Sequence, residues 1–299
     1  MPQQSNSRGL SPMVRLLAWY GCRFPEHRGK WRLHETIRRR LGIDIDTEQT
    51  VERGGLRWSL NPADYAQLHL FWFGVRDPWE VYHLLRILPP EAVVLQAGAN
   101  YGYYALSIAT ALGGKCRIFA VEPYPENYAR LVDHVRSNGL ERQIECCDAG
   151  VSDAEGIETM VRPKENSGHA HMVSSGPGAQ VRVKTIDRLV QEFGCERLDA
   201  LLIDVEGYED RALRGAAETL ARFRPFILVE LWPPAMRQQG TTVEAAVEVL
   251  DKHGYRLFYA LKQQLLPVTG LPSGDDRLYA FCFHRDRIPP WLGKAQPGG

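Results

Sequence analysis

The chain has 299 residues, of which 44% are hydrophobic and 24% charged, and this is the composition of an ordinary soluble globular protein. Its length allows one large α/β domain with additions or two small domains. The formal net charge of zero gives no indication of a global attraction to nucleic acid, and no apolar run approaches the roughly 20 residues that span a bilayer.

We expect residues 1–74 to form a basic, mainly helical N-terminal extension. Before Leu41 nine residues are basic and two are acidic. Leu33, Ile37 and Leu41 have the spacing of one helical face. A basic segment of this kind could recognise an acidic glycan or lie against a membrane surface, and the plainer alternative, which we favour, is a solvated helical face. The apolar stretch MVRLLAWYG is short and broken by Arg15, so no signal peptide is expected.

The next segment predicts a short strand, LRWSLNP, and then a helix that Pro89-Pro90 ends. Six residues of this helix are expected to pack inward: Trp79, Val81, Tyr82, Leu84, Leu85 and Ile87. Aromatic rings can stack on sugar faces, but we expect the aromatic group of this region to be core. That group is Trp72, Phe73, Trp79 and Tyr82.

From Glu91 onward strands and helices alternate, which predicts a parallel sheet with crossover helices. Seven strands are expected, at 92–96, 117–122, 143–149, 199–206, 225–231, 255–261 and 277–283. Helices are expected at 102–112, 125–138, 185–193, 208–222 and 241–253. Between residues 156 and 183, two antiparallel strands, IETMVR and VRVKTI, should flank the loop SGHAHMVSSGPG.

A small-residue loop follows the first of these strands, in the stretch VVLQAGANYGYYALSIA. Such a loop brings backbone amides close to a ligand. Glu122 ends the next strand, where an acid in dinucleotide folds accepts hydrogen bonds from the adenosine ribose. An NAD loop would need a second glycine at the position of Asn100 so that a diphosphate can approach. Asn100 suits the methionine tail of S-adenosylmethionine better.

The sequence resembles the FkbM-type S-adenosylmethionine-dependent methyltransferases over roughly residues 75–285. The matching segments, in chain order, are VVLQAGANYGYYALSIA, VEPYPENYARLVDHVRSNGL, CDAGVSD, VKTIDRL and LLIDVEGYEDRALRGAAETLARFRPFILVEL. The resemblance implies a class I, Rossmann-like α/β methyltransferase fold with a mostly parallel seven-stranded sheet and an antiparallel last strand. Residues 286–299 would be a C-terminal tail. The resemblance also implies S-adenosylmethionine as the cofactor, and methyl transfer to hydroxyl oxygens of sugars and natural-product scaffolds.

The resemblance also implies roles for the residues that match the family motif. Four loop residues would line the methionine part of the cofactor: Gly98, Asn100, Tyr101 and Gly102. Glu122 would bind the ribose, and Asp148 would lie near the adenine. The departure is Gln96, because the family loop opens with an acid that helps to hold the cationic end of the cofactor. Gln96 accepts a hydrogen bond but carries no charge, which predicts weaker cofactor binding.

Methyl transfer to a hydroxyl benefits from a general base. Asp204 and Glu206 end the fourth strand and, being two residues apart, share one face; the alternative is a helix cap and a solvated acid. Glu230 ends the fifth strand and would contact the acceptor or satisfy a nearby backbone group. His169 and His171, if extended, would lie on one side of their loop as bases. The histidines and acids do not form a recognised metal-ligand pattern, so no metal is expected.

We therefore expect a cytoplasmic S-adenosylmethionine-dependent O-methyltransferase acting on a hydroxyl of a saccharide or glycosylated natural product. The six cysteines form no CxxC pair, in keeping with a reducing compartment. The expected partner is a small-molecule or glycan acceptor, with no nucleic acid and no integral membrane segment; a homo-oligomer stays open. The rivals are a nitrogen or carboxyl methyltransferase of the same fold, a catalytically inactive cofactor-binding scaffold, and an NAD-type oxidoreductase, which the loop disfavours.

Overall fold

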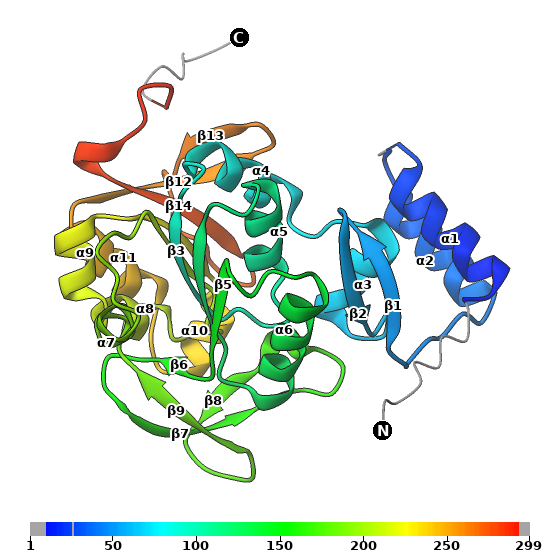
Figure 1. Cartoon of the computed structure of the whole chain (residues 1–299), viewed down its shortest axis with the longest axis horizontal. Helices are drawn as coiled ribbons and strands as arrows, with labels where there is room; N and C mark the ends of the chain where they lie inside the picture. The colour runs from blue at the N-terminus through cyan, green and yellow to red at the C-terminus, as the bar shows by residue number, and fades with distance from the viewer. Residues whose placement is uncertain (1–9, 26, 293–299) are drawn as a thin grey trace. The chain divides into compact units, whose positions relative to one another are not determined.

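The computed structural model describes residues 10–25 and 27–292. The chain forms two compact units (Figure 1). The N-terminal unit contains Met1–Pro78 and also Pro163–Gly168, and the C-terminal unit contains Trp79–Arg162 and His169–Gly299. Within the described residues, no helix is both long enough and apolar enough to cross a membrane.

The N-terminal unit is built from three helices and one hairpin. These are α1 (Pro12–Arg23), α2 (Lys30–Arg40), β1 (Gln49–Arg53), β2 (Leu56–Leu60) and α3 (Tyr65–Phe73). The mainly helical character of this segment and the strand at LRWSL are thus confirmed. Asp64 caps α3 by accepting from Ala66 N at 2.9 Å, as cap residues do. Its other oxygen accepts from Ser167 N at 3.0 Å, which ties the distant segment 163–168 into this unit.

The leucine face predicted on α2 is exposed to solvent. Leu33 is 46% and Leu41 is 48% exposed, whereas the buried side of the helix carries Lys30 and His34. His34 packs its ring against Trp72 at 5.0 Å between centroids. Burial holds the pKa of His34 down, to about 4, so this ring is a neutral core group near pH 7.

The C-terminal unit is built on an eight-stranded sheet in the order β13-β12-β14-β11-β10-β3-β4-β5. The strands are β3 (Val93–Ala97), β4 (Arg117–Val121), β5 (Ile144–Cys147), β10 (Ala200–Ile203), β11 (Phe226–Leu231), β12 (Tyr255–Leu261), β13 (Gln264–Pro267) and β14 (Leu278–His284). The five strands from β11 to β5 are parallel, and β14 is antiparallel to both of its neighbours. The seven predicted strands and the antiparallel last strand are confirmed, so the fold is that of a class I methyltransferase.

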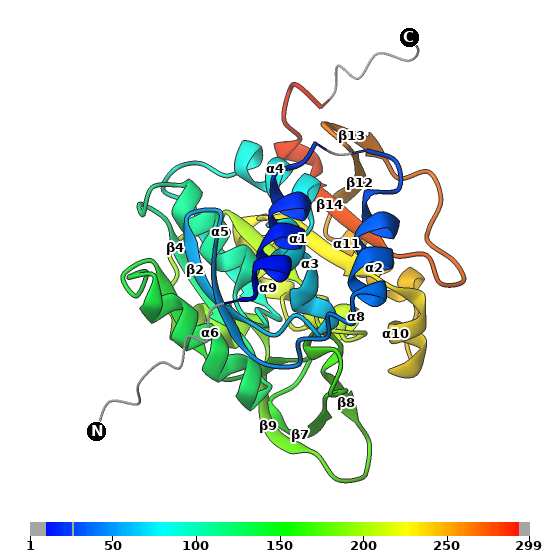
Figure 2. The same ribbon diagram turned by 90° about the vertical axis from the view of Figure 1, so that its right-hand side faces the viewer.

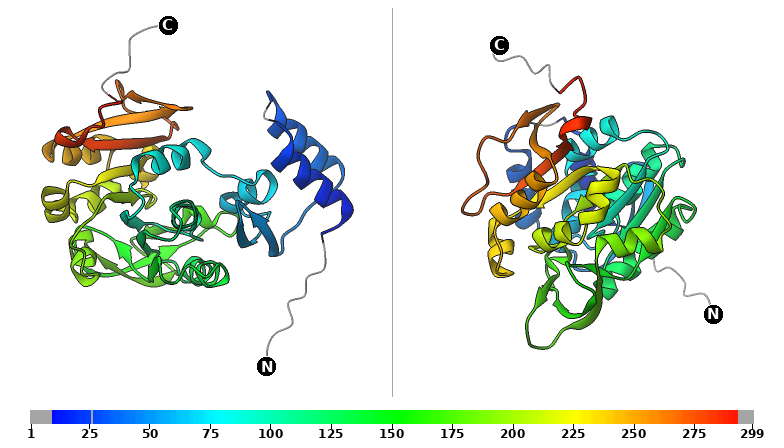
Figure 3. Two further views of the ribbon diagram at one scale, coloured as in Figure 1. Left: turned by 45° about the horizontal axis from the view of Figure 1, so that its top comes forward. Right: turned by 90° about the vertical axis from the view of Figure 1, so that its left-hand side faces the viewer.

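One edge of this sheet has a strand that the sequence did not predict. β13 forms a hairpin with β12 through the pairs Leu261↔Gln264 to Phe258↔Pro267. The orange and red strands β12, β13 and β14 lie together at this edge in both views of Figure 3.

Helices cover both faces of the sheet, as alternation of strands and helices requires. α4 (Pro78–Ile87), α5 (Tyr103–Ala111) and α6 (Pro125–Ser137) lie on one face, and α7 (Ile186–Glu192), α8 (Glu209–Arg214), α9 (Ala217–Phe223) and α11 (Val243–Lys252) on the other (Figure 1). In α4, Leu84 is fully buried as predicted. Trp79 is 37% exposed, so its predicted place in the core is wrong; it lies in the first turn, beyond the sheet-facing stripe.

The helix predicted over 208–222 is two helices, α8 and α9. Gly215 lies between them, and a Cβ there would be 2.2 Å from the carbonyl oxygen of Ser152, so only glycine allows this approach. Asp187 caps the second helix: its carboxylate accepts from Glu218 N at 3.0 Å and from Thr219 N at 2.8 Å. A cap from a distant residue cannot be read from the local sequence.

A second, four-stranded sheet carries the predicted antiparallel pair. Its strands are β6 (Gly150–Val151), β7 (Gly156–Val161), β8 (His171–Val173) and β9 (Ala179–Lys184), and β7 pairs antiparallel with β9. They form the green projection at the bottom of Figure 2. The sheet contacts the helix α10 (Pro233–Gln238), because Gln239 after it donates to Met172 O at 3.0 Å. This brings the small sheet next to the carboxyl ends of β10 and β11. The short 3-10 helices η1 (Ser167–His169) and η2 (Arg285–Arg287) complete the described elements.

Candidate active site

The loop after β3 is held in a conformation that requires glycine. Gly98 has φ +82, and a Cβ there would lie 1.7 Å from the carbonyl oxygen of Asp204. The amides of Gly98 and Ala99 both donate to Val121 O at 3.0 Å. The ends of β3, β4 and β10 thus meet at Gly98, at the carboxyl edge where open α/β sheets bind their ligands.

Asn100 links this loop to the acid of the next strand. Its φ is +49, a left-handed conformation that asparagine tolerates better than most residues. Its backbone N–H donates to Glu122 Oε2 at 2.8 Å. Its side-chain oxygen is buried and has no hydrogen-bond partner among the described residues. The loop therefore presents an unused acceptor at the carboxyl edge.

The other two loop residues serve the packing of the loop. Gly102 has φ +94, and a Cβ there would be 2.6 Å from Leu106 and 2.7 Å from Leu131. Tyr101 is 1% exposed, and its carbonyl accepts from His134 Nδ1 at 2.8 Å. The side chain of Tyr101 is a core group, so only its backbone is placed to line a ligand.

Glu122 follows β4 and is buried, with 4% of its surface exposed. It accepts from the amides of Asn100 and Tyr124 at 2.8 and 3.0 Å and from Asn127 Nδ2 at 3.4 Å. Burial raises its pKa to about 7, against the opposing effect of these donors and of Arg162. A carboxylate has about four lone-pair directions, so this arrangement leaves room for a ribose hydroxyl.

Asp148 lies just beyond the end of β5 but points toward the small sheet. It is exposed, and its Oδ1 pairs with Arg182 Nη2 of β9 at 2.6 Å. Its predicted place near the adenine remains a prediction.

These features fit S-adenosylmethionine. Gly98 and Gly102 let the backbone approach a ligand, and the orphaned Asn100 oxygen suits an ammonium group. When bound, the cofactor supplies a methyl group on a positively charged sulfur.

The catalytic candidates Asp204, Glu206 and Glu230 form what we call the acidic cluster. One carboxylate oxygen from each lies within 4.8 Å of the others. Asp204 and Glu206 follow β10 and are half-buried, whereas Glu230 in β11 is only 2% exposed. The side-by-side pairing of β10 and β11 creates the cluster, since the register places Ile203 opposite Val229. Asp204 and Glu206 were expected on one face, and the structure brings Glu230 of the next strand beside them; their catalytic roles stay a prediction.

The loop after β10, which carries Asp204 and Glu206, has a strained backbone and is held by hydrogen bonds to Glu209. Glu206 has φ +52, which is uncommon for a residue other than glycine or asparagine. Glu209 Oε1 accepts from the amides of Val205 and Gly207 at 3.1 and 3.2 Å. Burial and then the nearby Glu230 raise the pKa of Glu209 to about 8. Burial, Glu230 and Asp204 raise the pKa of Glu206 well above its usual value.

Two residues that the sequence reasoning missed border the cluster. Arg277 Nη1 contacts Glu230 Oε1 at 2.8 Å, and its guanidinium lies 4.3 Å from the ring centroid of Trp232. Trp232 follows β11 directly, so its place after a strand end was a signal in the sequence. Arg277 precedes β14, and only the antiparallel pairing of β14 with β11 brings it here.

The two histidines are separated by the structure. His169 belongs to the 3-10 helix η1, and its ring packs on Trp232 at 5.1 Å between centroids. His171 starts β8, and its Nδ1 lies 2.9 Å from the carbonyl oxygen of His169. The expectation that both lie on one side of an extended segment is wrong, because η1 ends at His169. His169 stays next to the candidate site.

A small pocket lies beside the acidic cluster, and we call it the carboxyl-edge pocket. It is lined by Gln96, Ala97, Tyr104, Leu202, Ile203, Asp204, Leu228, Glu230 and Tyr279. Gln96 is 3% exposed, and its Oε1 has no hydrogen-bond partner among the described residues.

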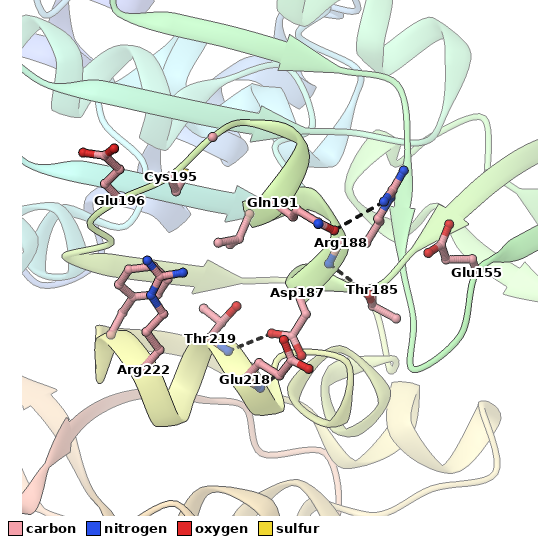
Figure 4. A pocket seen from close by; sticks show the side chains of 13 residues that line it. Glu155, Thr185, Asp187, Arg188, Gln191, Cys195, Glu196, Glu218, Thr219 and Arg222 are labelled. Atoms are coloured by element: carbon pink, nitrogen blue, oxygen red, sulfur yellow. Dashed lines mark hydrogen bonds between the residues drawn. The ribbon is translucent and has the colours of Figure 1, made fainter.

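A larger hollow of about 680 Å³ lies between α7 and α9, and we call it the amino-edge hollow (Figure 4). It adjoins Gly194–Glu196 and Phe223, which lead into the amino ends of β10 and β11. Two of its charged groups have partners: Asp187 caps α9, and Arg188 pairs with Glu192 at 2.9 Å. None of the predicted site residues lines it.

The chain is similar to three characterised proteins at low identity. It is 26% identical to AMB antimetabolite synthetase AmbE of Pseudomonas aeruginosa, over 80% of this chain and 12% of that protein. It is 26% identical to hexuronic acid methyltransferase AglP of Haloferax volcanii, over 52% of this chain and 64% of that protein. It is 24% identical to 2-O-methyltransferase NoeI of Sinorhizobium fredii, over 62% and 83%. The chain thus spans about an eighth of AmbE and less than two thirds of AglP.

The family model described as the methyltransferase FkbM domain matches residues 96–257, which is more than half of the chain. The matched range begins at Gln96 and includes the Gly98 loop, Glu122 and the acidic cluster. The chain therefore belongs to the FkbM family of methyltransferases, and the cofactor of its C-terminal unit, called the catalytic unit from here on, is S-adenosylmethionine.

Proposed function

We propose that this protein is an O-methyltransferase that acts on a hydroxyl of a saccharide or glycosylated natural product. The observation that carries the proposal is the acidic cluster beside the Gly98 loop. Asp204 O is the atom that a Cβ at position 98 would touch, so the residue that carries the candidate base adjoins the candidate cofactor loop.

Each residue has a distinct part in the proposed reaction. Asp204 accepts the proton of the acceptor hydroxyl as the oxygen attacks the methyl carbon. Glu230 is fixed by Arg277 and orients the acceptor rather than taking its proton, because the ion pair holds that carboxylate in place. Glu206, beside both, contributes a further hydrogen-bond acceptor.

The acceptor class is supported by the borders of the cluster and by the relatives. Trp232 is half-buried and adjoins both His169 and Arg277, which provides a flat apolar surface with polar groups at its rim. Aromatic rings with a polar surround suit the apolar faces of sugar rings. AglP is named for a hexuronic acid and NoeI for 2-O-methylation.

The test is a methyl-transfer assay with S-adenosylmethionine on a panel of hydroxyl, amine and carboxylate acceptors, with the product located by mass spectrometry. We expect transfer to a sugar hydroxyl. Asp204→Asn should then lower kcat about 100-fold, the lower range for a general base, and change the Kd of S-adenosylhomocysteine less than threefold. Asp133→Asn on the exposed side of α6 is the matched control and should match wild type.

Other outcomes would replace the proposal. Product on nitrogen or on a carboxylate would assign a different methyltransferase of the same fold. Tight binding of S-adenosylhomocysteine with no product on any acceptor would favour a binding scaffold, the alternative that Gln96 suggests. Wild-type kcat in Asp204→Asn would make Asp204 structural.

A further inference from the structure

The exposed apolar side chains of this protein gather in its first two helices. Of the thirteen large hydrophobic residues that are exposed within the described part of the chain, seven lie between residues 13 and 41. They are Met13, Leu16, Trp19, Phe24, Trp31, Leu33 and Leu41. A single exposed apolar residue needs no explanation, whereas a gathering of them marks an interaction surface.

The packing of α1 on α3 decides which face of α1 is free. The buried residues of α1 recur at helical spacing and are Val14, Leu17, Ala18 and Gly21. A Cβ at Gly21 would lie 2.1 Å from the carbonyl oxygen of Trp72 in α3, so the two helices are in close contact here. The face of α1 opposite to Gly21 is therefore turned away from α3.

This outer face of α1 carries both apolar and basic side chains. Leu16 is 60% and Trp19 is 56% exposed, and their spacing of three residues puts them on one side of the helix. Arg15 lies four residues before Trp19 and Arg23 four residues after it, so an exposed arginine is one turn away in each direction.

Helix α2 adds arginines to the same surface. Its buried residue His34 packs on Trp72, the residue that Gly21 of α1 also meets, so both helices cover the same end of α3. The two helices contact each other, and Figure 2 shows them side by side. Three exposed arginines lie on α2: Arg32, Arg39 and Arg40. Together with Arg15, Leu16, Trp19 and Arg23 they form what we call the arginine–tryptophan face.

The acids of this segment do not balance its arginines. Two acids precede Leu41, against nine basic residues. Glu35 is 16% exposed and is engaged by Arg38 at 3.0 Å and by Arg39 at 3.6 Å; Glu26 lies outside the described residues. The surplus of positive charge favours an anionic partner.

We propose that the arginine–tryptophan face binds the surface of a bilayer that contains anionic phospholipids. Such a surface accommodates both kinds of side chain, because arginines meet the anionic headgroups while Trp19 and Leu16 enter the boundary between headgroups and acyl chains. Tryptophan is enriched at this depth. The binding is peripheral, and it does not rest on the proposed function.

Other occupants fit this face less well. A second copy seated on it through a two-fold axis would bring the arginines of both copies together, and like charges across an interface are unfavourable. Nucleic acid would attract the arginines, but its sugar-phosphate surface offers Leu16 no apolar contact.

The test is sedimentation of the full chain with large vesicles. One set is phosphatidylcholine alone, and the other is phosphatidylcholine with phosphatidylglycerol. We expect binding to the anionic set to be at least about tenfold tighter. Raising NaCl from about 0.1 M to about 1 M should weaken it, because the screening length falls from about 10 Å to about 3 Å.

Two variants separate the apolar and the basic contributions. Leu16→Ser combined with Trp19→Ser should weaken binding to the anionic vesicles about tenfold or more, because the apolar area that enters the bilayer is lost. Arg15→Gln combined with Arg32→Gln and Arg40→Gln should weaken it about 100-fold, because three charges no longer meet the headgroups.

Each variant has a matched control in the catalytic unit. Ile157→Ser combined with Leu261→Ser replaces two exposed apolar residues. Arg136→Gln combined with Arg142→Gln and Arg256→Gln removes three exposed arginines. Both controls should bind the anionic vesicles like wild type, and the melting temperature of every variant checks its fold.

The proposal is overturned if the chain binds neither set of vesicles, if it binds both sets equally, or if a control weakens binding as much as its matched variant. Unchanged binding after Leu16→Ser with Trp19→Ser would also overturn it, since the attraction would then be electrostatic alone. Without vesicle binding, self-association that this double variant removes would assign the face to a second copy, and binding of a duplex RNA would assign it to nucleic acid.

Discussion

The carboxyl-edge pocket is much smaller than the amino-edge hollow, yet it is the one of the two that has a buried polar atom without a hydrogen-bond partner among the described residues. The amino-edge hollow holds about 680 Å³, but in it Asp187 accepts from the backbone of α9 and Arg188 pairs with Glu192 (Figure 4). The carboxyl-edge pocket is far smaller, yet it adjoins crowded carboxylates and a buried amide oxygen with no partner. Unmet polar groups, rather than volume, mark the edge at which a ligand is needed.

The largest effect is expected where the strands of the carboxyl edge meet. Gly98→Ala would place a methyl group 1.7 Å from Asp204 O at a φ of +82, so the backbone must shift. We expect a loss of at least about 4 kcal/mol in the free energy of unfolding, measured by denaturant titration. Gly113→Ala, also at positive φ but with nothing within 4 Å, should cost only about 1–2 kcal/mol. Equal losses in the two variants would show that the close approach does not matter.

Two single substitutions, one at each edge of the sheet, separate an effect on ligand binding from an effect on stability. Glu122→Gln removes a charged acceptor, so the Kd of S-adenosylhomocysteine should rise about tenfold or more. Asp187→Ala removes the cap of α9, so unfolding should become easier by about 1 kcal/mol, with the Kd unchanged. Calorimetry and thermal melts check both. An unchanged Kd in Glu122→Gln would refute the ribose role.

The last expected effect is a pH dependence of stability. Burial raises the pKa of Glu122 from 4.5 to about 7 in the folded protein. Between these values the folded state holds a proton that the unfolded state has lost, so stability falls as pH rises. The contribution is full below pH 4.5 and is lost by about pH 7, with a slope on the order of 1 kcal/mol per pH unit. Glu122→Gln should flatten this slope, as followed by urea unfolding; an unchanged slope would assign the titration to another group.

The sequence predicted the elements of the catalytic unit well because its strands and helices have strong local patterns. The seven strands, the Gly98 loop and the shared edge of Asp204, Glu206 and Glu230 follow from periodicity and from the geometry of parallel sheets.

The predictions that failed depend on contacts between distant residues. The break between α8 and α9 requires Ser152 and Asp187, and Arg277 reaches the site only through the pairing of β14 with β11. The separation of His169 from His171 results from a single 3-10 turn that no spacing rule predicts. Local sequence patterns determine the helices and strands, whereas the site also depends on contacts between residues that are far apart in the chain.

Segment 163–168 has a consequence for where this protein can be cut. Its backbone is bound by Asp64 and by Tyr65 N, which donates to Glu165 O at 2.9 Å, and both partners precede Pro78. A fragment that starts at residue 79 would therefore retain the segment without the residues that order it. His169, on Trp232, follows the segment directly. The boundary between the two units is thus not a single boundary in the chain, and a fragment cut at residue 79 would carry a segment that has lost its hydrogen-bond partners.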